Sequence, residues 1–128
     1  MGNERTQQLL DALNQRILVL DGAMGTMIQQ RNLTTADFGG PALEGCNENL
    51  VLTRPDVIRD IHRQYFAAGA HIVETNTFGG TPLVLAEYGL ADKYRELNAA
   101  AVKLARILPN SGPTLTRAIA PEIGRAHV

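Results

Sequence analysis

Two short apolar runs, each ended by a carboxylate beside small residues, constrain the fold of this chain most. Residues 17–26 read ILVLDGAMGT, and residues 71–80 read HIVETNTFGG. Consecutive apolar residues rich in Ile and Val are typical of a strand buried on both faces of a parallel sheet. In such α/β folds the polar site forms where the carboxyl ends of the strands meet. The sequence therefore predicts an α/β chain with strands at 17–20 and 72–75 and a site at their ends.

Helical periodicity accounts for much of the remaining chain. Thr6 is placed to cap a first helix. Thr53 stands three residues before Asp56 in a capping-box arrangement, with Pro55 in the first turn of a longer helix that Gly69 is placed to end. The expected buried stripes, at helical spacing, are Leu9, Leu10 and Leu13, then Val57, Ile58, Ile61 and Tyr65, then Tyr94, Leu97, Ala101, Leu104 and Leu108.

Shorter segments complete the expected order of elements. Residues 24–30 and 82–88 are expected to form short helices, and residues 31–52 to be loop-like because glycine and proline interrupt any period. Residues 109–113, PNSGP, break the last helical pattern. The resulting order implies parallel strands joined by helical crossovers.

Composition narrows the class of partner. A length of 128 residues suits one modest domain, and the net charge of -1 gives no electrostatic reason to expect nucleic acid or an anionic membrane. No apolar stretch approaches the roughly 20 residues of a membrane span. The single cysteine cannot form an intramolecular disulfide, which favours a reducing cytoplasm.

The turn DGAMGT at residues 21–26 is the first candidate binding site. The Asp21 carboxylate can accept hydrogen bonds from an ammonium group, and the backbone N–H groups that follow can hold a carboxylate or a phosphate. Together they suit the amino and carboxyl groups of an amino acid. The alternative interpretation is an ordinary βα turn, in which Asp-Gly is chosen for its conformation and Asp21 caps the helix.

The polar run from Glu74 to Thr77 is the second candidate. These residues follow Ile72 and Val73 without a turn residue, so some of their side chains must point toward the interior. Buried polar groups need hydrogen-bond partners. A substrate is one candidate partner, and an internally satisfied network is the other.

The remaining titratable side chains form no recognisable cluster. Cys46 has no second cysteine and no nearby histidine, whereas a zinc site takes three or four ligands. It is therefore interpreted as a small structural residue. His62 is expected to face solvent or to be partly packed, His71 opens a strand, and His127 lies in the tail. We assign no metal ligand and no catalytic side chain.

Three stretches of the chain resemble the homocysteine S-methyltransferase family, in particular the homocysteine-binding domain of cobalamin-dependent methionine synthases. They are ILVLDGAMGT at 17–26, GCNENLVLTRPDVI at 45–58 and AAGAHIVETNTFGGT at 67–81. The resemblance covers about residues 10–108, in order and in register. It implies a (β/α)8 TIM barrel, of which this chain holds the first two or three βα units.

The resemblance also implies chemistry. In that family a zinc ion held by three cysteine thiolates activates the thiol of homocysteine, since zinc lowers the pKa of a bound thiol. The methyl group comes from methylcobalamin, which 5-methyltetrahydrofolate recharges. In relatives the Asp of the Asp-Gly-Ala motif holds the substrate ammonium. Carried over, this assigns Asp21 to the amino group and Gly22 and Ala23 to the carboxylate. The same mouth is expected to be lined by Glu74, Asn76 and Thr77.

The chain departs from the family in three ways. Cys46 aligns with a loop cysteine that is not a zinc ligand, and the family's Gly-Gly-Cys-Cys signature has no counterpart here. A barrel takes about 250 residues, and residues 109–113 stand where the third strand of such a barrel should follow, so that strand is expected to be shortened or lost. His71 stands where relatives usually carry Asp. We therefore expect residues 1–122 to be an N-terminal fragment that is inactive alone. Its expected partners are homocysteine, the missing remainder of the barrel, and downstream cobalamin and folate domains.

Three alternatives stay open. The parent protein could be a cobalamin-independent homocysteine S-methyltransferase that uses a sulfonium or betaine donor. The chain could be a non-catalytic amino-acid-binding module. It could also be a fragment that self-associates through unpaired strand edges and uncovered apolar helix faces.

The last six residues, 123–128, are expected to be a non-native tail. They read IGRAHV, which is what ATC GGA AGA GCA CAC GTC encodes, and that string is a common sequencing-adapter sequence. The alternative is a genuine C-terminal tail.

Overall fold

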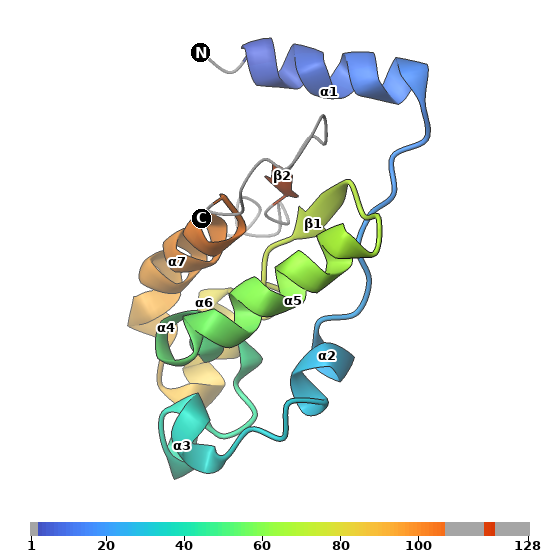
Figure 1. Ribbon diagram of the computed structural model, residues 1–128. Helices are drawn as coiled ribbons and strands as arrows, with labels where there is room; N and C mark the ends of the chain where they lie inside the picture. The colour runs from blue at the N-terminus through green and yellow to red at the C-terminus, as the bar shows by residue number, and fades with distance from the viewer. Residues whose placement is uncertain (1–2, 107–116, 120–128) are drawn as a thin grey trace.

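The structure is a computed structural model, which describes residues 3–106 and 117–119 (Figure 1). The expected tail at 123–128, the break at 109–113 and Leu108 lie outside the described residues. Helices make up most of the described chain, and none of them is long and apolar enough to cross a membrane. The helices are α1 (Asn3–Gln15), α2 (Gly25–Gln29), α3 (Thr35–Phe38), α4 (Leu50–Thr53), α5 (Pro55–Ala67), α6 (Pro82–Leu85) and α7 (Tyr94–Arg106). The 3-10 turns are η1 (Pro41–Leu43), η2 (Asn47–Asn49), η3 (Ala86–Tyr88) and η4 (Ala91–Lys93), and the strands are β1 (Ile72–Glu74) and β2 (Arg117–Ile119).

The strands are parallel, as the sequence predicts. Strand β1 pairs with β2 in the register Ile72 to Arg117, and Leu20 forms a parallel bridge to Ile72 on the other edge of β1. Of the two expected outcomes for the third strand, shortened or lost, the structure excludes loss. A strand of three residues is present, and it begins at Arg117, beyond the proline-flanked break.

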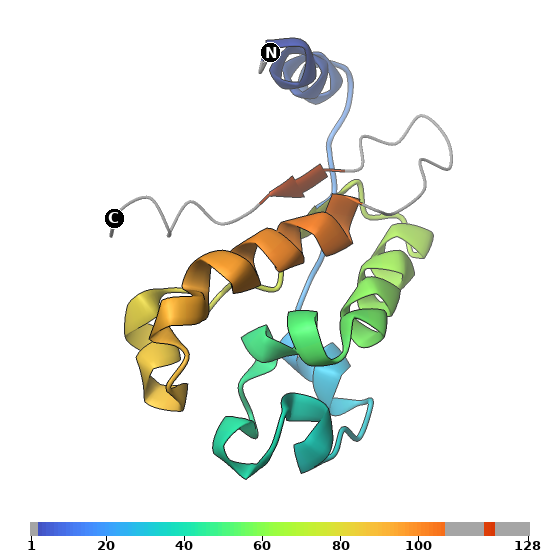
Figure 2. The ribbon, with the colours of Figure 1, turned by 90° about the vertical axis from the view of Figure 1, so that its left-hand side faces the viewer.

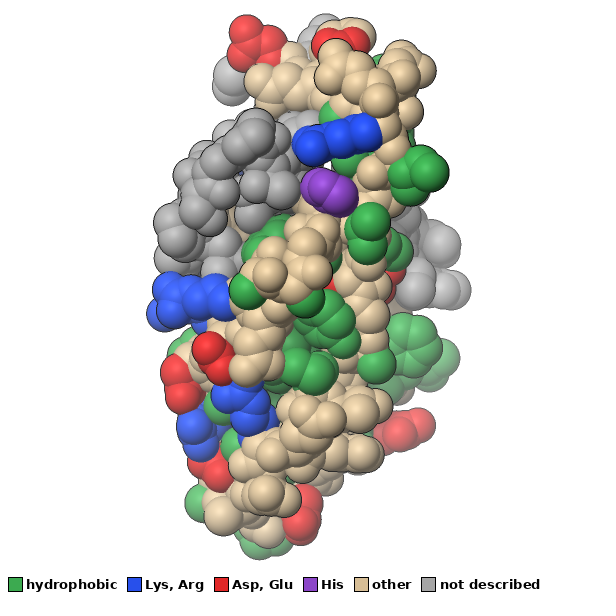
Figure 3. Space-filling model, turned by 45° about the vertical axis from the view of Figure 1, so that its right-hand side comes forward, with side chains coloured by type: hydrophobic (Ala, Val, Ile, Leu, Met, Phe, Trp, Pro, Cys, Tyr) green, Lys and Arg blue, Asp and Glu red, His purple; other side chains and the backbone are tan. Residues whose placement is uncertain are grey.

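The first predicted strand, residues 17–20, is reduced to the single bridge at Leu20. The expectation that it is buried on both faces is wrong, because Ile17 is 88% exposed and Val19 is 50% exposed. Among the described residues it has one neighbouring strand, β1. Apolar side chains of a strand become buried only where other elements cover both faces. Hydrophobic side chains accordingly reach the surface on this side of the molecule (Figure 3).

The core lies between the helices that follow. Helices α4, α5 and α7 pack on one another, and α5 also covers β1 (Figure 2). The aliphatic residues of the predicted stripes of α5 and α7 are buried where they are described: Ile58 and Ile61 are fully buried, and Leu97 is 2% exposed. Burial of each such side chain stabilises the fold by about 1.5–3 kcal/mol. Tyr65 and Tyr94 are partly buried and pack against the same core. This cluster is the framework that fixes the position of β1.

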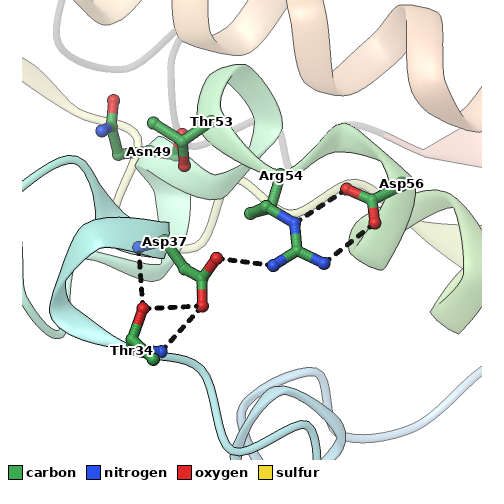
Figure 4. A network of polar contacts seen from close by, with 6 residues as sticks. All are labelled: Thr34, Asp37, Asn49, Thr53, Arg54 and Asp56. Atoms are coloured by element: carbon green, nitrogen blue, oxygen red, sulfur yellow. Dashed lines mark hydrogen bonds and ion pairs between the residues drawn. The ribbon is translucent and has the colours of Figure 1, made fainter.

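Helix α5 starts without the predicted capping box. Its first residue is Pro55, as expected, but the residue before it, Arg54, caps the helix without a side-chain hydrogen bond. The carboxylate of Asp56 instead accepts two hydrogen bonds from the Arg54 guanidinium at 3.0 Å, which also donates to Asp37 at 2.6 Å (Figure 4). Thr53 donates its hydroxyl hydrogen bond to the Asn49 carbonyl. The predicted capping box is wrong because the Asp56 carboxylate, which would accept the Thr53 N–H in such a box, binds the Arg54 guanidinium instead.

Residues 31–52, expected to be loop-like, contain α3, α4, η1 and η2. Local caps start and stop the first of these short elements, α3. Thr34 and Asp37 form a reciprocal capping box on α3, and Gly39 ends it at a φ of 110°. Single turns hold too few residues for an apolar period to be visible in the sequence.

Helix α1 lies beyond the strand end of the molecule, apart from α5 and α7 in both ribbon views (Figures 1 and 2). It begins at Asn3, so Thr6 lies within the helix and is not its cap. The predicted buried stripe is also wrong, since Leu10 is 48% and Leu13 is 53% exposed. Only Ala12 of this helix is buried among the described residues.

Two histidines have structural positions that the sequence does not reveal. His62 is fully buried, not solvent-facing or partly packed, and neither ring nitrogen has a hydrogen-bond partner among the described residues. His71 accepts a hydrogen bond from the backbone N–H of Val19 through Nδ1 at 2.9 Å. A carboxylate can accept the same bond, so an Asp at this position would keep the link to Val19.

Candidate binding cavity

The two predicted strand ends meet. Asp21 donates its backbone N–H to the Ile72 carbonyl at 2.9 Å, and its carboxylate accepts the N–H of Glu74 at 3.1 and 3.2 Å. The turn that follows Leu20 is thereby held beside the loop that follows β1. This is the juxtaposition that the order of strands predicts.

A cavity of about 470 Å³ lies between the two segments. Five of the six predicted binding residues line it: Asp21, Gly22, Ala23, Glu74 and Asn76. Thr77 is not among the lining residues; it is 7% exposed, and its hydroxyl is bonded to that of Thr75 at 2.7 Å. For Thr77 the internally satisfied network is therefore the observed arrangement. The wall is completed by Met24, Gly25, Asn47, Glu48, Thr75 and Phe78.

The cavity is acidic. Asp21, Glu48 and Glu74 line it, and no Lys, Arg or His is among the lining residues. Partial burial raises the pKa of Asp21 from 3.8 to about 6, against the lowering effect of the Glu74 N–H, and the negative charge of Glu74 raises it further. A cationic group in the cavity would oppose both raising effects. The arrangement therefore favours an ammonium group as ligand.

Free backbone donors lie next to these carboxylates. The N–H groups of residues 22–25 donate to no acceptor within the described part of the chain. All four residues line the cavity. Unpaired N–H groups at the wall of a pocket suit an anionic group such as a carboxylate. Asp21 and this turn thus offer the two complements that a free amino acid needs.

A second pair of contacts holds the far wall. Glu48 accepts the N–H of Gly79 at 2.9 Å, and Asn76 donates its side-chain amide to the Asn47 carbonyl at 2.8 Å. These bonds join η2 to the loop after β1. Asn47 and Glu48 are lining residues that the sequence did not predict. Asn47 lies 29 residues from Asn76, and Glu48 lies 31 residues from Gly79, so neither contact leaves a periodic signal in the sequence.

Cys46 lies behind that wall and is fully buried. Burial raises the pKa of its thiol, so the thiol stays protonated and donates toward Glu48 at 3.8 Å. Among the residues that the structure describes, no three His, Cys, Asp or Glu side chains are grouped to hold a metal ion. This donor set does not fit the three-thiolate zinc site that the resemblance implies.

Several known proteins are similar to this chain in sequence and in fold. The family model for homocysteine S-methyltransferases matches residues 18–127. Methionine synthases from Mycobacterium tuberculosis and Mycobacterium leprae are each 55% identical over 98 residues, which are 77% of this chain and 8% of each relative. The chain therefore spans less than a tenth of the length of these relatives.

Solved structures agree with the sequence match. The homocysteine methyltransferase MmuM from Escherichia coli, in its oxidized form, has a TM-score of 0.62 and 32% identity over 81% of this chain and 33% of its own. The metallated form has a TM-score of 0.67 and 26% identity over 88% of this chain and 39% of its own. The chain belongs to the homocysteine S-methyltransferase family.

Proposed function

We propose that this chain provides the homocysteine-binding part of a methionine synthase. The observation that carries the proposal is the Asp21 carboxylate at the cavity wall, directly beside the unpaired N–H groups of residues 22–25. Asp21 binds the ammonium group of homocysteine, and Gly22 and Ala23 bind its carboxylate. Glu74, beside Asp21, and Asn76 contact the ligand from the loop after β1, and Thr77 supports them through Thr75. The thiol is left free to face the methyl donor.

The reaction assigned to the parent protein is methyl transfer to the sulfur of homocysteine, giving methionine. The donor is methylcobalamin, recharged by 5-methyltetrahydrofolate on further domains. The 55% identity to methionine synthases, against 32% and 26% to the homocysteine methyltransferase MmuM, supports a methionine synthase as the parent protein. Three zinc-binding thiolates have to come from elsewhere in the protein, because this chain has one cysteine. We infer that the chain alone binds homocysteine without methylating it.

The same proposal gives the fold a context. The parallel order of Leu20, β1 and β2, with helices on the outer face of β1, matches consecutive βα units of a barrel. We infer that the described chain is part of a (β/α)8 barrel and that its cavity opens at the carboxyl end of the strands.

Calorimetric titration of the 128-residue chain tests the binding claim. L-homocysteine is compared with 4-sulfanylbutanoic acid, which keeps the thiol and the carboxylate but lacks the amino group. Asp21→Asn removes the charge that the ammonium needs, so affinity for homocysteine should fall by about 10-fold or more, the energy of a charge-assisted hydrogen bond. Affinity for 4-sulfanylbutanoic acid should change less than about twofold.

Asp92→Asn serves as the matched control, because Asp92 is an exposed carboxylate away from the cavity. It should leave both affinities unchanged. Equal losses for both ligands in Asp21→Asn, or no binding of homocysteine by the wild-type chain, would contradict the proposal.

A further inference from the structure

Tyr65, on the last turns of α5, contacts the binding turn from behind. Its hydroxyl donates a hydrogen bond to the Ala23 carbonyl at 2.5 Å. Its ring lies against Gly22, where an added Cβ would stand 3.3 Å from the Tyr65 hydroxyl oxygen and 3.5 Å from Cε1. Neither the family match nor the cavity lining singles out this tyrosine, since it does not line the cavity.

The position of Tyr65 is itself fixed. Its backbone carbonyl accepts the N–H of Ala70 at 3.0 Å, in the turn that ends α5 through Gly69 at a φ of 109°. One helical turn earlier, Ile61 is fully buried in the core. The backbone of Tyr65 is therefore held at the end of a helix that packs in the core, and its hydroxyl reaches the binding turn from there.

The hydrogen bond determines which way the next amide points. In a trans peptide unit the C=O of Ala23 and the N–H of Met24 lie in one plane and point in opposite directions. The described chain has no cis peptide bond. With the Ala23 carbonyl held by Tyr65, the Met24 N–H points away from α5. Met24 lines the cavity, and its N–H has no acceptor among the described residues.

We propose that Tyr65 is a positioning residue, which orients the peptide unit between Ala23 and Met24 so that the Met24 N–H receives the carboxylate of the substrate beside the N–H groups of Gly22 and Ala23. This inference rests on the proposed function. It assigns to Tyr65 a role in recognition of the carboxylate alone, because the amino group is bound by Asp21 on the other side of the turn. Gly22 bears on the same contact, since an added Cβ would stand 3.3 Å from the Tyr65 hydroxyl oxygen and the tyrosine would have to shift by a few tenths of an ångström.

The experiment compares Tyr65→Phe with wild type, using L-homocysteine and 3-aminopropane-1-thiol, which lacks the carboxylate. NMR titration of the 128-residue chain gives both affinities, and the Met24 amide reports the turn directly. Loss of one neutral hydrogen bond is expected to weaken the binding of homocysteine by about 3- to 10-fold. Affinity for 3-aminopropane-1-thiol should stay within about twofold, because it has no carboxylate to bind. The control is Tyr88→Phe, which removes the hydroxyl of another half-buried tyrosine packed on the same core.

The outcomes separate the two claims. The inference is supported if Tyr65→Phe loses affinity for homocysteine but not for 3-aminopropane-1-thiol, and if Tyr88→Phe keeps the wild-type affinity for both. Unchanged affinity for both ligands, or an equal loss for both, overturns it while the proposed function stands. Failure of the wild-type chain to bind homocysteine overturns the proposed function and this inference together. If Tyr65→Phe does not fold, Gly22→Ala is used instead, and the same selective loss is required.

Discussion

Helices α4, α5 and α7 form a helical cluster, and residues 3–20 form an N-terminal arm. Both regions contain apolar stretches, but they differ in what covers those stretches. Ile61 on α5 is fully buried, whereas Ile17 on the arm is 88% exposed. Helices α4, α5 and α7 cover one another, while the arm touches the described chain through Leu20, Val19 and their bonds to β1. The comparison teaches that an apolar run specifies burial only where a partner is present. The candidate binding cavity lies at the boundary between the two regions.

The largest difference in the free energy of unfolding should appear when the same substitution, Ile to Ala, is made once in each region. Ile61→Ala removes a fully buried side chain and is expected to lower the free energy of unfolding by about 2–5 kcal/mol. Ile17→Ala should change it by less than about 0.5 kcal/mol, since that side chain is exposed. Urea denaturation followed by circular dichroism measures both. Equal losses of unfolding free energy in the two variants would show that Ile17 is covered in solution, and would contradict the difference in burial between the arm and the helical cluster.

A pH-dependent effect of intermediate size should come from His62. Burial lowers the pKa of its imidazole from 6.5 to about 4. Between these values the unfolded chain binds a proton that the folded chain does not, so stability falls as the pH drops from 6.5 toward 4. Replacing the ring by His62→Leu should remove roughly 1–3 kcal/mol of that fall.

Thermal unfolding at pH 7.5, 6 and 5 measures the pH dependence in both proteins. Parallel curves for wild type and His62→Leu would mean that His62 is not buried as described. The effect belongs to the helical cluster, because His62 lies on α5 beside the fully buried Ile61.

The smallest effect should come from the link between the regions. His71→Ala removes the acceptor of the Val19 N–H and should cost about 0.5–1.5 kcal/mol, confined to the arm. His71→Asp keeps an acceptor at this position and is the matched control. Amide hydrogen exchange of Val19 should accelerate in His71→Ala and stay near the wild-type rate in His71→Asp. Acceleration in both variants would contradict the role given to the imidazole.

The two regions also differ in how far the sequence predicts them. The stripes of α5 and α7 follow from helical spacing alone, because amphipathic helices that pack together carry their own pattern. The strand at 17–20 and the stripe of α1 have equally clear patterns, yet their burial depends on neighbouring elements. The burial of His62 was missed because a histidine between Ile61 and Arg63 carries no sign of which face it joins.

The candidate site was predictable where the chain order fixes it. Asp21, Gly22, Ala23 and Glu74 follow directly from the two strand ends. Glu48 and Tyr65 did not, because each reaches the site from another element through a single contact. Thr77 was placed in the mouth by sequence proximity, but its side chain turns to Thr75. Positions next to a strand end are thus readable from sequence, whereas supporting contacts from distant segments are not.

The pKa of Asp21 tests the binding proposal most directly. NMR of its carboxyl carbon gives this value in the free chain and in the presence of saturating L-homocysteine. We predict a pKa of about 6 in the free chain, and a fall of roughly one unit or more when the ligand ammonium lies against the carboxylate. A pKa that stays near 6 with homocysteine bound would show that the amino group is held elsewhere, and would contradict the role of Asp21.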